Sequence, residues 1–152
     1  MNIFILNENP ELAARDYCNK HLPKMTVEML QMLGSAVIRH GATPDMMPLT
    51  KKGTPLKGGY HNHPCTRWVG DSSDNYVWTV RHALEICKEY TNKYNKIHFY
   101  IFTILIKMFG IITNQINFRL YYRLSKLISF FISDDVICKI KILKDTNFIF
   151  YL

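Results

Sequence analysis

The fold is decided by two adjacent stretches, YHNHPCTRW at residues 60–68 and SSDNYVWTVRHALEICKEYTNKY at residues 72–94. The second stretch predicts a long helix, because an aspartate and two serines at residues 71–73 are suited to cap its first turn. Its apolar residues recur three or four positions apart and so predict one buried face: Tyr76, Val80, Ala83, Cys87, Tyr90 and Tyr94. The His-Pro pair of the first stretch predicts a rigid turn that carries Trp68 into the core.

A second row of side chains lies beside this apolar face: Trp78, His82, Glu85 and Glu89. These residues are also three or four positions apart, so they share one side of the predicted helix. An aromatic, a titratable base and two acids fit a functional site. They fit a solvated helix face as well, and the sequence leaves both interpretations open.

Another long helix is predicted from about residues 19–22 to Gly41, with Pro23 in its first turn and Gly41 as C-cap. Its apolar stripe comprises Met25, Met29, Met32, Leu33, Ala36 and Val37. Gly34 within this stripe indicates close packing. A short helix from about Pro10 to Cys18 is expected before it. Residues 42–70 are rich in proline, glycine and lysine and predict a long basic loop.

The 152 residues are enough for one domain with a core, and a formal net charge of +7 favours an anionic partner such as nucleic acid. The four cysteines contain no CxxC pair, and no leader with a cleavage site is recognised. Free buried thiols and a cytoplasmic location, in a host cell if the protein is viral, are therefore expected.

The composition changes after His98. Residues 99–152 hold eight of the nine phenylalanines but no proline, histidine, tryptophan or glutamate. Three interpretations stay open for this tail: further core helices, a membrane-surface helix, or a frameshifted or divergent extension. Its apolar run at residues 99–112 is shorter than a bilayer requires, so a membrane partner is not expected. We divide the chain into a helical domain at 1–98 and a tail at 99–152.

Two groups of residues are candidates for chemistry. His61, His63 and Cys65 alternate along one segment and fit a metal site, although no fourth ligand stands at a recognisable spacing. His21 and Glu28 are two helical turns apart and project from one face, beside Lys20 and Lys24. A histidine and a glutamate among lysines are suited to acid–base work on a phosphate-bearing substrate, and a solvated face remains the alternative.

A further pattern is carried by several short motifs: Asn19-Lys20-His21, Lys24-Met25, Glu28, Lys57-Gly58-Gly59-Tyr60-His61-Asn62-His63-Pro64, Trp68, Asn75-Tyr76, Trp78, Lys88-Glu89-Tyr90-Thr91, Tyr94, Lys96 and His98. In these the chain is similar to a family of small proteins from phages and large DNA viruses. That family in turn resembles the pyrimidine-dimer DNA glycosylases of the phage endonuclease type, which carry Asp-x-His and a glutamate seven residues after the histidine. Asn19, His21 and Glu28 stand at those positions. The resemblance covers residues 1 to about 98.

The resemblance implies a compact helical enzyme that excises damaged pyrimidines through an imine between an amine and the sugar C1′. Glu28 would stabilise the cationic intermediate and move protons, and His21 would orient the substrate. The glycosylases use the amine of an N-terminal threonine, whereas Asn2 follows Met1 here. The amine would therefore be that of Met1 or of a lysine such as Lys24, and this copy is degraded if the tail is foreign.

We therefore predict a mostly α, single-domain protein with two long packed helices and a long basic loop between them. The predicted function is a DNA glycosylase/AP lyase acting on duplex DNA, without a metal or another cofactor. The predicted catalytic residues are Glu28, His21 and Met1, and the predicted DNA-binding residues are Lys20, Lys24, Lys57, His63, Arg67 and Trp68. The alternatives are a non-catalytic nucleic-acid-binding protein and a metal-dependent hydrolase using His61, His63 and Cys65. The oligomeric state is not predicted.

Overall fold

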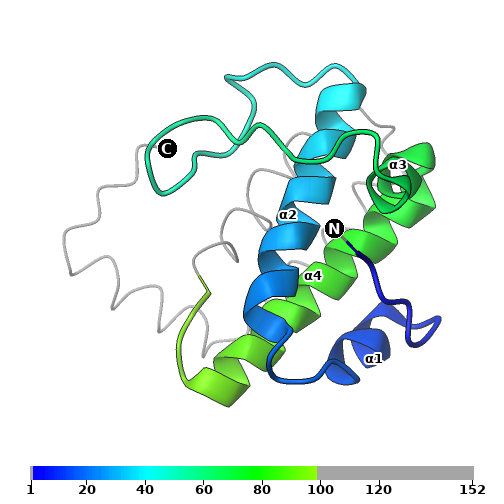
Figure 1. The fold of residues 1–152 in the computed structure, drawn as a ribbon, viewed down its shortest axis with the longest axis vertical. Coiled ribbons are helices and arrows are strands. Elements are labelled where there is room, and N and C mark those ends of the chain that lie inside the picture. The colour runs from blue at the N-terminus through cyan, green and yellow to red at the C-terminus, as the bar shows by residue number, and fades with distance from the viewer. Residues whose placement is uncertain (1, 99–152) are drawn as a thin grey trace, which may run out of the picture. The chain divides into compact units, whose positions relative to one another are not determined.

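The computed structural model describes residues 2–98, in which four helices form (Figure 1). They are α1 (Pro10–Arg15), α2 (Leu22–Arg39), α3 (Pro64–Asp71) and α4 (Ser73–Tyr94). The described residues contain no strand, and an isolated antiparallel bridge joins Leu49 to Pro55 within the long loop. The predicted fold class, a helical domain with two long packed helices, is confirmed. The predictions for the tail, and the position of Met1, lie outside the described residues.

The core lies where α2 and α4 pack against each other. All six residues of the predicted α2 stripe are buried, as are the first four of the predicted α4 stripe. Tyr90 is half-buried and Tyr94 is 39% exposed, because the last turns of α4 extend past the packed part of α2. The periodicity of the sequence therefore predicts the core correctly except at the end of α4.

Helix α1 packs on α4, and its start is fixed by Asn9, whose side chain accepts hydrogen bonds from the backbone N–H groups of residues 11 and 12. The helix ends at Arg15, three residues before the predicted end at Cys18. The chain leaves the helix there because the next residues turn the Tyr17 side chain into the core, where it is 7% exposed. Cys18 is consequently exposed rather than buried as expected, and it is a free thiol like Cys65 and Cys87.

Helix α3 occupies part of the stretch expected to be a loop. His63 caps it, its ring Nδ1 accepting a hydrogen bond from the Cys65 N–H at 3.2 Å, and Pro64 is its first residue. The helix packs on the second half of α2. Extended backbone at Ser72 ends α3, and the Ser72 side chain caps α4 by accepting from the Asn75 N–H. The predicted His-Pro turn is therefore a helix start, and Trp68 is half-buried against Trp78.

The long basic loop is hydrogen-bonded to α2 near the C-terminal end of the loop. The Ser35 hydroxyl donates to the Gly59 carbonyl at 3.0 Å and accepts from the Gly59 N–H at 2.8 Å. Gly58 has a φ of +69°, and a Cβ there would overlap the Ser35 backbone, so both its conformation and its contact require glycine. A Cβ at Gly34 would meet the Leu56 side chain at 3.0 Å, which confirms close packing. Within residues 2–98 no helix combines the length and apolarity needed to cross a membrane.

Candidate active site at the start of helix α2

The Glu28 carboxylate lies against the N-terminal segment of the chain. Its Oε2 accepts a hydrogen bond from the Asn2 backbone N–H at 3.0 Å, and its Oε1 lies 3.4 Å from the Lys24 Nζ. The Glu28 side chain is 13% exposed, whereas the Lys24 side chain is 72% exposed. A largely enclosed carboxylate thus faces a lysine amine on one side and the first described residue of the chain on the other.

The N-terminal segment is held there by Tyr17 and His21. The Tyr17 hydroxyl accepts from the Phe4 N–H at 3.1 Å and lies 3.3 Å from the Phe4 carbonyl oxygen. The ring of Phe4 stacks nearly parallel to that of His21, with centroids 6.0 Å apart. His21 and Glu28, predicted to share a face, therefore both contact this segment, Glu28 at Asn2 and His21 at Phe4.

The Tyr17 hydroxyl has a raised pKa. Burial, and to a smaller extent the negative charge of Glu28, raises the pKa of Tyr17 to about 12, although its hydrogen bond with Phe4 acts in the opposite direction. The neutral hydroxyl is available both to donate and to accept, which suits it to hold a backbone segment beside a carboxylate. The sequence patterns did not identify Tyr17. Its position two residues before Asn19, where the family motif begins, was the one sign that it could lie near the site.

The row Trp78, His82, Glu85 and Glu89 is an anchor for α1 rather than a solvated face. His82 and Glu85 are 0% and 1% exposed. The His82 Nδ1 donates to the Pro10 carbonyl at 2.8 Å, and Glu85 Oε1 accepts from the Arg15 guanidinium at 2.8 and 3.0 Å. Burial lowers the pKa of His82. The solvated interpretation is wrong for His82 and Glu85, because both side chains are buried against partners about 70 positions earlier in the sequence.

The predicted DNA-binding residues fall into separate groups on the surface. Lys20 and Lys24 are exposed at the start of α2, Lys57 is exposed in the loop fastened to Ser35, and Arg67 is exposed on α3. His63 and Trp68 are half-buried, His63 as the cap of α3. Since α3 packs on the second half of α2, these groups follow α2 from one end to the other and do not form one cluster.

A metal site at His61, His63 and Cys65 finds no support in the geometry. The described residues contain no group of three or more histidines, cysteines or acids placed to hold a metal ion. His63 instead uses its Nδ1 to cap α3.

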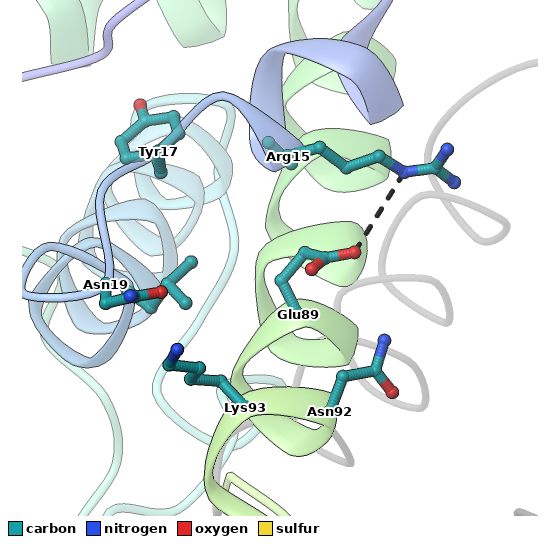
Figure 2. Close-up of a pocket in the computed structure, with 8 residues that line it drawn as sticks. Arg15, Tyr17, Asn19, Glu89, Asn92 and Lys93 are labelled. Atoms are coloured by element: carbon teal, nitrogen blue, oxygen red, sulfur yellow. Dashed lines mark ion pairs between the residues drawn. The ribbon is translucent and has the colours of Figure 1, made fainter.

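A pocket of about 220 Å³ lies between the end of α1 and the last turns of α4. Figure 2 shows Arg15 reaching toward Glu89, with Asn92 and Lys93 further along α4 and Asn19 across the gap. The Arg15 Nε lies 4.0 Å from the Glu89 carboxylate. The pocket is lined by both positive and negative side chains, some of which pair with one another, so the lining does not favour a ligand of one charge.

The fold and the site at Glu28 define a small helical protein that presents a carboxylate beside the Lys24 amine near the start of a long helix. The family model described as pyrimidine dimer DNA glycosylase matches residues 1–101, two-thirds of the chain. The chain belongs to the pyrimidine dimer DNA glycosylase family, and the predicted resemblance is confirmed. No curated protein and no solved structure matches it.

Proposed function

We propose that this protein is a DNA glycosylase/AP lyase that removes damaged pyrimidines from duplex DNA through an imine intermediate. The observation that supports it best is the hydrogen bond between the Asn2 N–H and the Glu28 carboxylate. It brings the start of the chain to the glutamate at the position that the family resemblance implies for the catalytic acid. Membership of the family supports the reaction class.

The reaction requires an amine nucleophile and a carboxylate that moves protons. The neutral amine attacks C1′ of the damaged nucleotide, the C1′–N bond breaks, and the base leaves with the bonding electron pair and takes up a proton. The attached amine then loses a proton, and its lone pair forms the C1′=N iminium as the C1′–O4′ bond breaks; the sugar ring opens and O4′ takes up a proton. The C2′ proton next to this iminium is acidic. Glu28 removes that proton, the electron pair forms the C1′–C2′ enamine, and the C3′–O bond then breaks with its electrons passing to the departing phosphate.

Two amines are candidates for the nucleophile. The α-amine of Met1 belongs to the residue directly before Asn2, and it serves as nucleophile where Met1 is the free N-terminus. The Lys24 amine lies 3.4 Å from Glu28 Oε1. Either amine would form the same kind of iminium, from which Glu28 removes the proton. Peptide mapping of the adduct identifies which amine reacts.

The surrounding residues supply DNA binding. Lys20, Lys57 and Arg67 are exposed cations without an ion pair among residues 2–98, which suits them to contact phosphates. The damaged nucleotide has to leave the base stack before its C1′ is reached. Trp68 offers an aromatic surface for stacking, His63 a polar contact beside it, and His21 orients the substrate next to Glu28.

Borohydride trapping on UV-irradiated duplex DNA tests the proposal. We expect a covalent protein–DNA adduct with the wild type, and mass mapping of the reduced adduct identifies Met1 or Lys24 as the amine. Glu28→Gln should lower strand cleavage, and Glu89→Gln is its matched control, since it neutralises a partly exposed glutamate of α4 that lies near Arg15 of α1. Absence of an adduct with folded protein would overturn the imine mechanism. Salt-dependent DNA binding without an adduct would instead support the non-catalytic alternative.

A further inference from the structure

A second pocket, of about 250 Å³, lies between the end of α2, the start of α3 and the segment before α3. Its polar lining consists of Ser35, Arg39, His61, Asn62 and Thr66, and its apolar lining of Ala36 and Ile38. No carboxylate lines it. The polar side chains include a guanidinium, an imidazole, an amide and hydroxyls, all of which are able to donate hydrogen bonds. Such a lining favours an anionic ligand.

Thr66 is the residue that points to a ligand. It is 2% exposed, and its hydroxyl oxygen has no hydrogen-bond partner among the described residues. A buried hydroxyl without a partner costs free energy, and nearly all such groups are satisfied in folded proteins. Thr66 is one of the residues that line the pocket, so a ligand whose acceptor oxygen reaches the Thr66 hydroxyl would satisfy it.

Arg39 is held in position at the rim of this pocket. Its guanidinium donates to the Asp71 carboxylate at 2.9 Å and lies against Gly70, where a Cβ would approach it to 2.7 Å. The bond to Asp71 uses one of the five N–H donors of the guanidinium. Asp71 therefore orients Arg39 while partly offsetting its charge, and the planar group keeps the geometry that suits phosphate oxygens.

The pocket is aligned with Glu28 along α2. Ser35 and Arg39 follow Glu28 by seven and eleven residues, so both project within about 20° of its direction and lie about 10 Å and about 16 Å further along the helix. A DNA strand running along α2 carries one phosphate about every 3.4 Å of its axis. The pocket then lies roughly three to five nucleotides from a sugar placed beside Glu28.

We propose that this pocket binds a phosphate group, and that in the DNA complex it holds a backbone phosphate a few nucleotides from the reacting sugar. The phosphate oxygens accept hydrogen bonds from Thr66, Asn62, His61 and Arg39. Phosphate binding is carried by the pocket alone, whereas the backbone assignment rests on the proposed function. The site is separate from the Glu28 carboxylate and gives the surface around α3 a positioning role.

Titration of the intact protein with inorganic phosphate, followed by amide NMR shifts, tests the pocket itself. Saturable shifts are expected at His61, Asn62 and Thr66, and Thr66→Val should weaken binding about tenfold. Thr79→Val is the matched control, because Thr79 is equally buried but donates its hydroxyl to the Asn75 carbonyl at 2.8 Å. Unchanged shifts in Thr66→Val, or no shifts in the wild type, would overturn the proposal.

Asn62→Ala provides a second variant at an exposed position, where loss of folding is not expected. It should weaken phosphate binding as Thr66→Val does, and equal affinity to wild type would count against the pocket.

The source of the phosphate is separated by the DNA used. One internal phosphate of the duplex, three to five nucleotides from the lesion, is replaced by an uncharged methylphosphonate. If the pocket holds that backbone phosphate, wild type and Thr66→Val should bind the modified duplex with equal affinity. If the affinity difference depends instead on a 5′-terminal phosphate, the pocket still binds phosphate, but its assignment to a backbone phosphate is overturned. The titration with inorganic phosphate does not require adduct formation, so failure of the pocket and failure of the imine mechanism are distinguishable.

Discussion

Glutamate and histidine occur together on α4 and around the start of α2, and the two arrangements have different physical characters. On α4, His82 and Glu85 are buried and bonded to Pro10 and Arg15. At the start of α2, His21 is exposed, and Glu28 keeps a side chain that is 13% exposed between Asn2 and Lys24. The same residue types therefore serve packing where their partners are buried and fixed, and stay accessible where solvent reaches them.

Replacing each glutamate in turn separates the two arrangements most directly. Glu28→Gln should reduce strand cleavage by at least about 100-fold, because the amide cannot accept the C2′ proton. Its melting temperature should change little, since the amide oxygen still accepts from the Asn2 N–H. Single-turnover cleavage of UV-irradiated duplex measures the effect. Cleavage within threefold of wild type would remove Glu28 from the mechanism.

Glu85→Ala should have the reverse profile. Removing this buried carboxylate empties part of the α1–α4 contact and releases Arg15, so we expect the melting temperature to fall by roughly 10 °C. Cleavage measured well below that temperature should remain near the wild-type rate. Glu89→Ala is the control, because Glu89 is 30% exposed and 4.0 Å from Arg15, and its loss should barely shift melting. Calorimetry of wild type, Glu85→Ala and Glu89→Ala measures the melting temperatures, and an equal melting temperature for Glu85→Ala and wild type would contradict the structural role of Glu85.

Much of the fold was predictable from sequence because α2 and α4 are long enough for their apolar periodicity to identify one buried face. Helix α3 was missed because its eight residues contain little more than two turns, and His63-Pro64 also fits a turn. The burial of His82 and Glu85 was not predictable, since their partners are 72 and 70 residues away in sequence. Glu28 was a candidate from its spacing to His21, which fits a solvated face as well, and the family resemblance implied its catalytic role.

The buried row on α4 should also make stability depend on pH. Burial lowers the pKa of His82, whose ring donates to the Pro10 carbonyl, contacts the Tyr17 hydroxyl and feels the charge of Glu11. In the unfolded chain His82 takes up a proton near pH 6.5, whereas in the folded state its lowered pKa delays protonation. The free energy of unfolding therefore falls as the pH drops below about 6.5 toward the pKa of His82 in the folded state.

The slope contributed by His82 should reach at most about 1.4 kcal/mol per pH unit. Urea unfolding of wild type and His82→Gln between pH 5 and pH 8 measures it. The variant should lose that part of the slope, and an identical slope in both proteins would show that His82 is not its source.

The smallest effect tests how the open site is held together. Tyr17→Phe removes the hydroxyl that bonds the Phe4 backbone and approaches His82 Nε2, which should cost about 1 kcal/mol and leave the core packing intact. If this hydroxyl positions the N-terminal segment beside Glu28, the single-turnover rate of adduct formation should fall about fivefold with an unchanged affinity for DNA. The Phe4 amide should exchange its hydrogen faster as well. A loss of stability without either change would make Tyr17 a packing residue, and would mean that Glu28 alone keeps the start of the chain at the site.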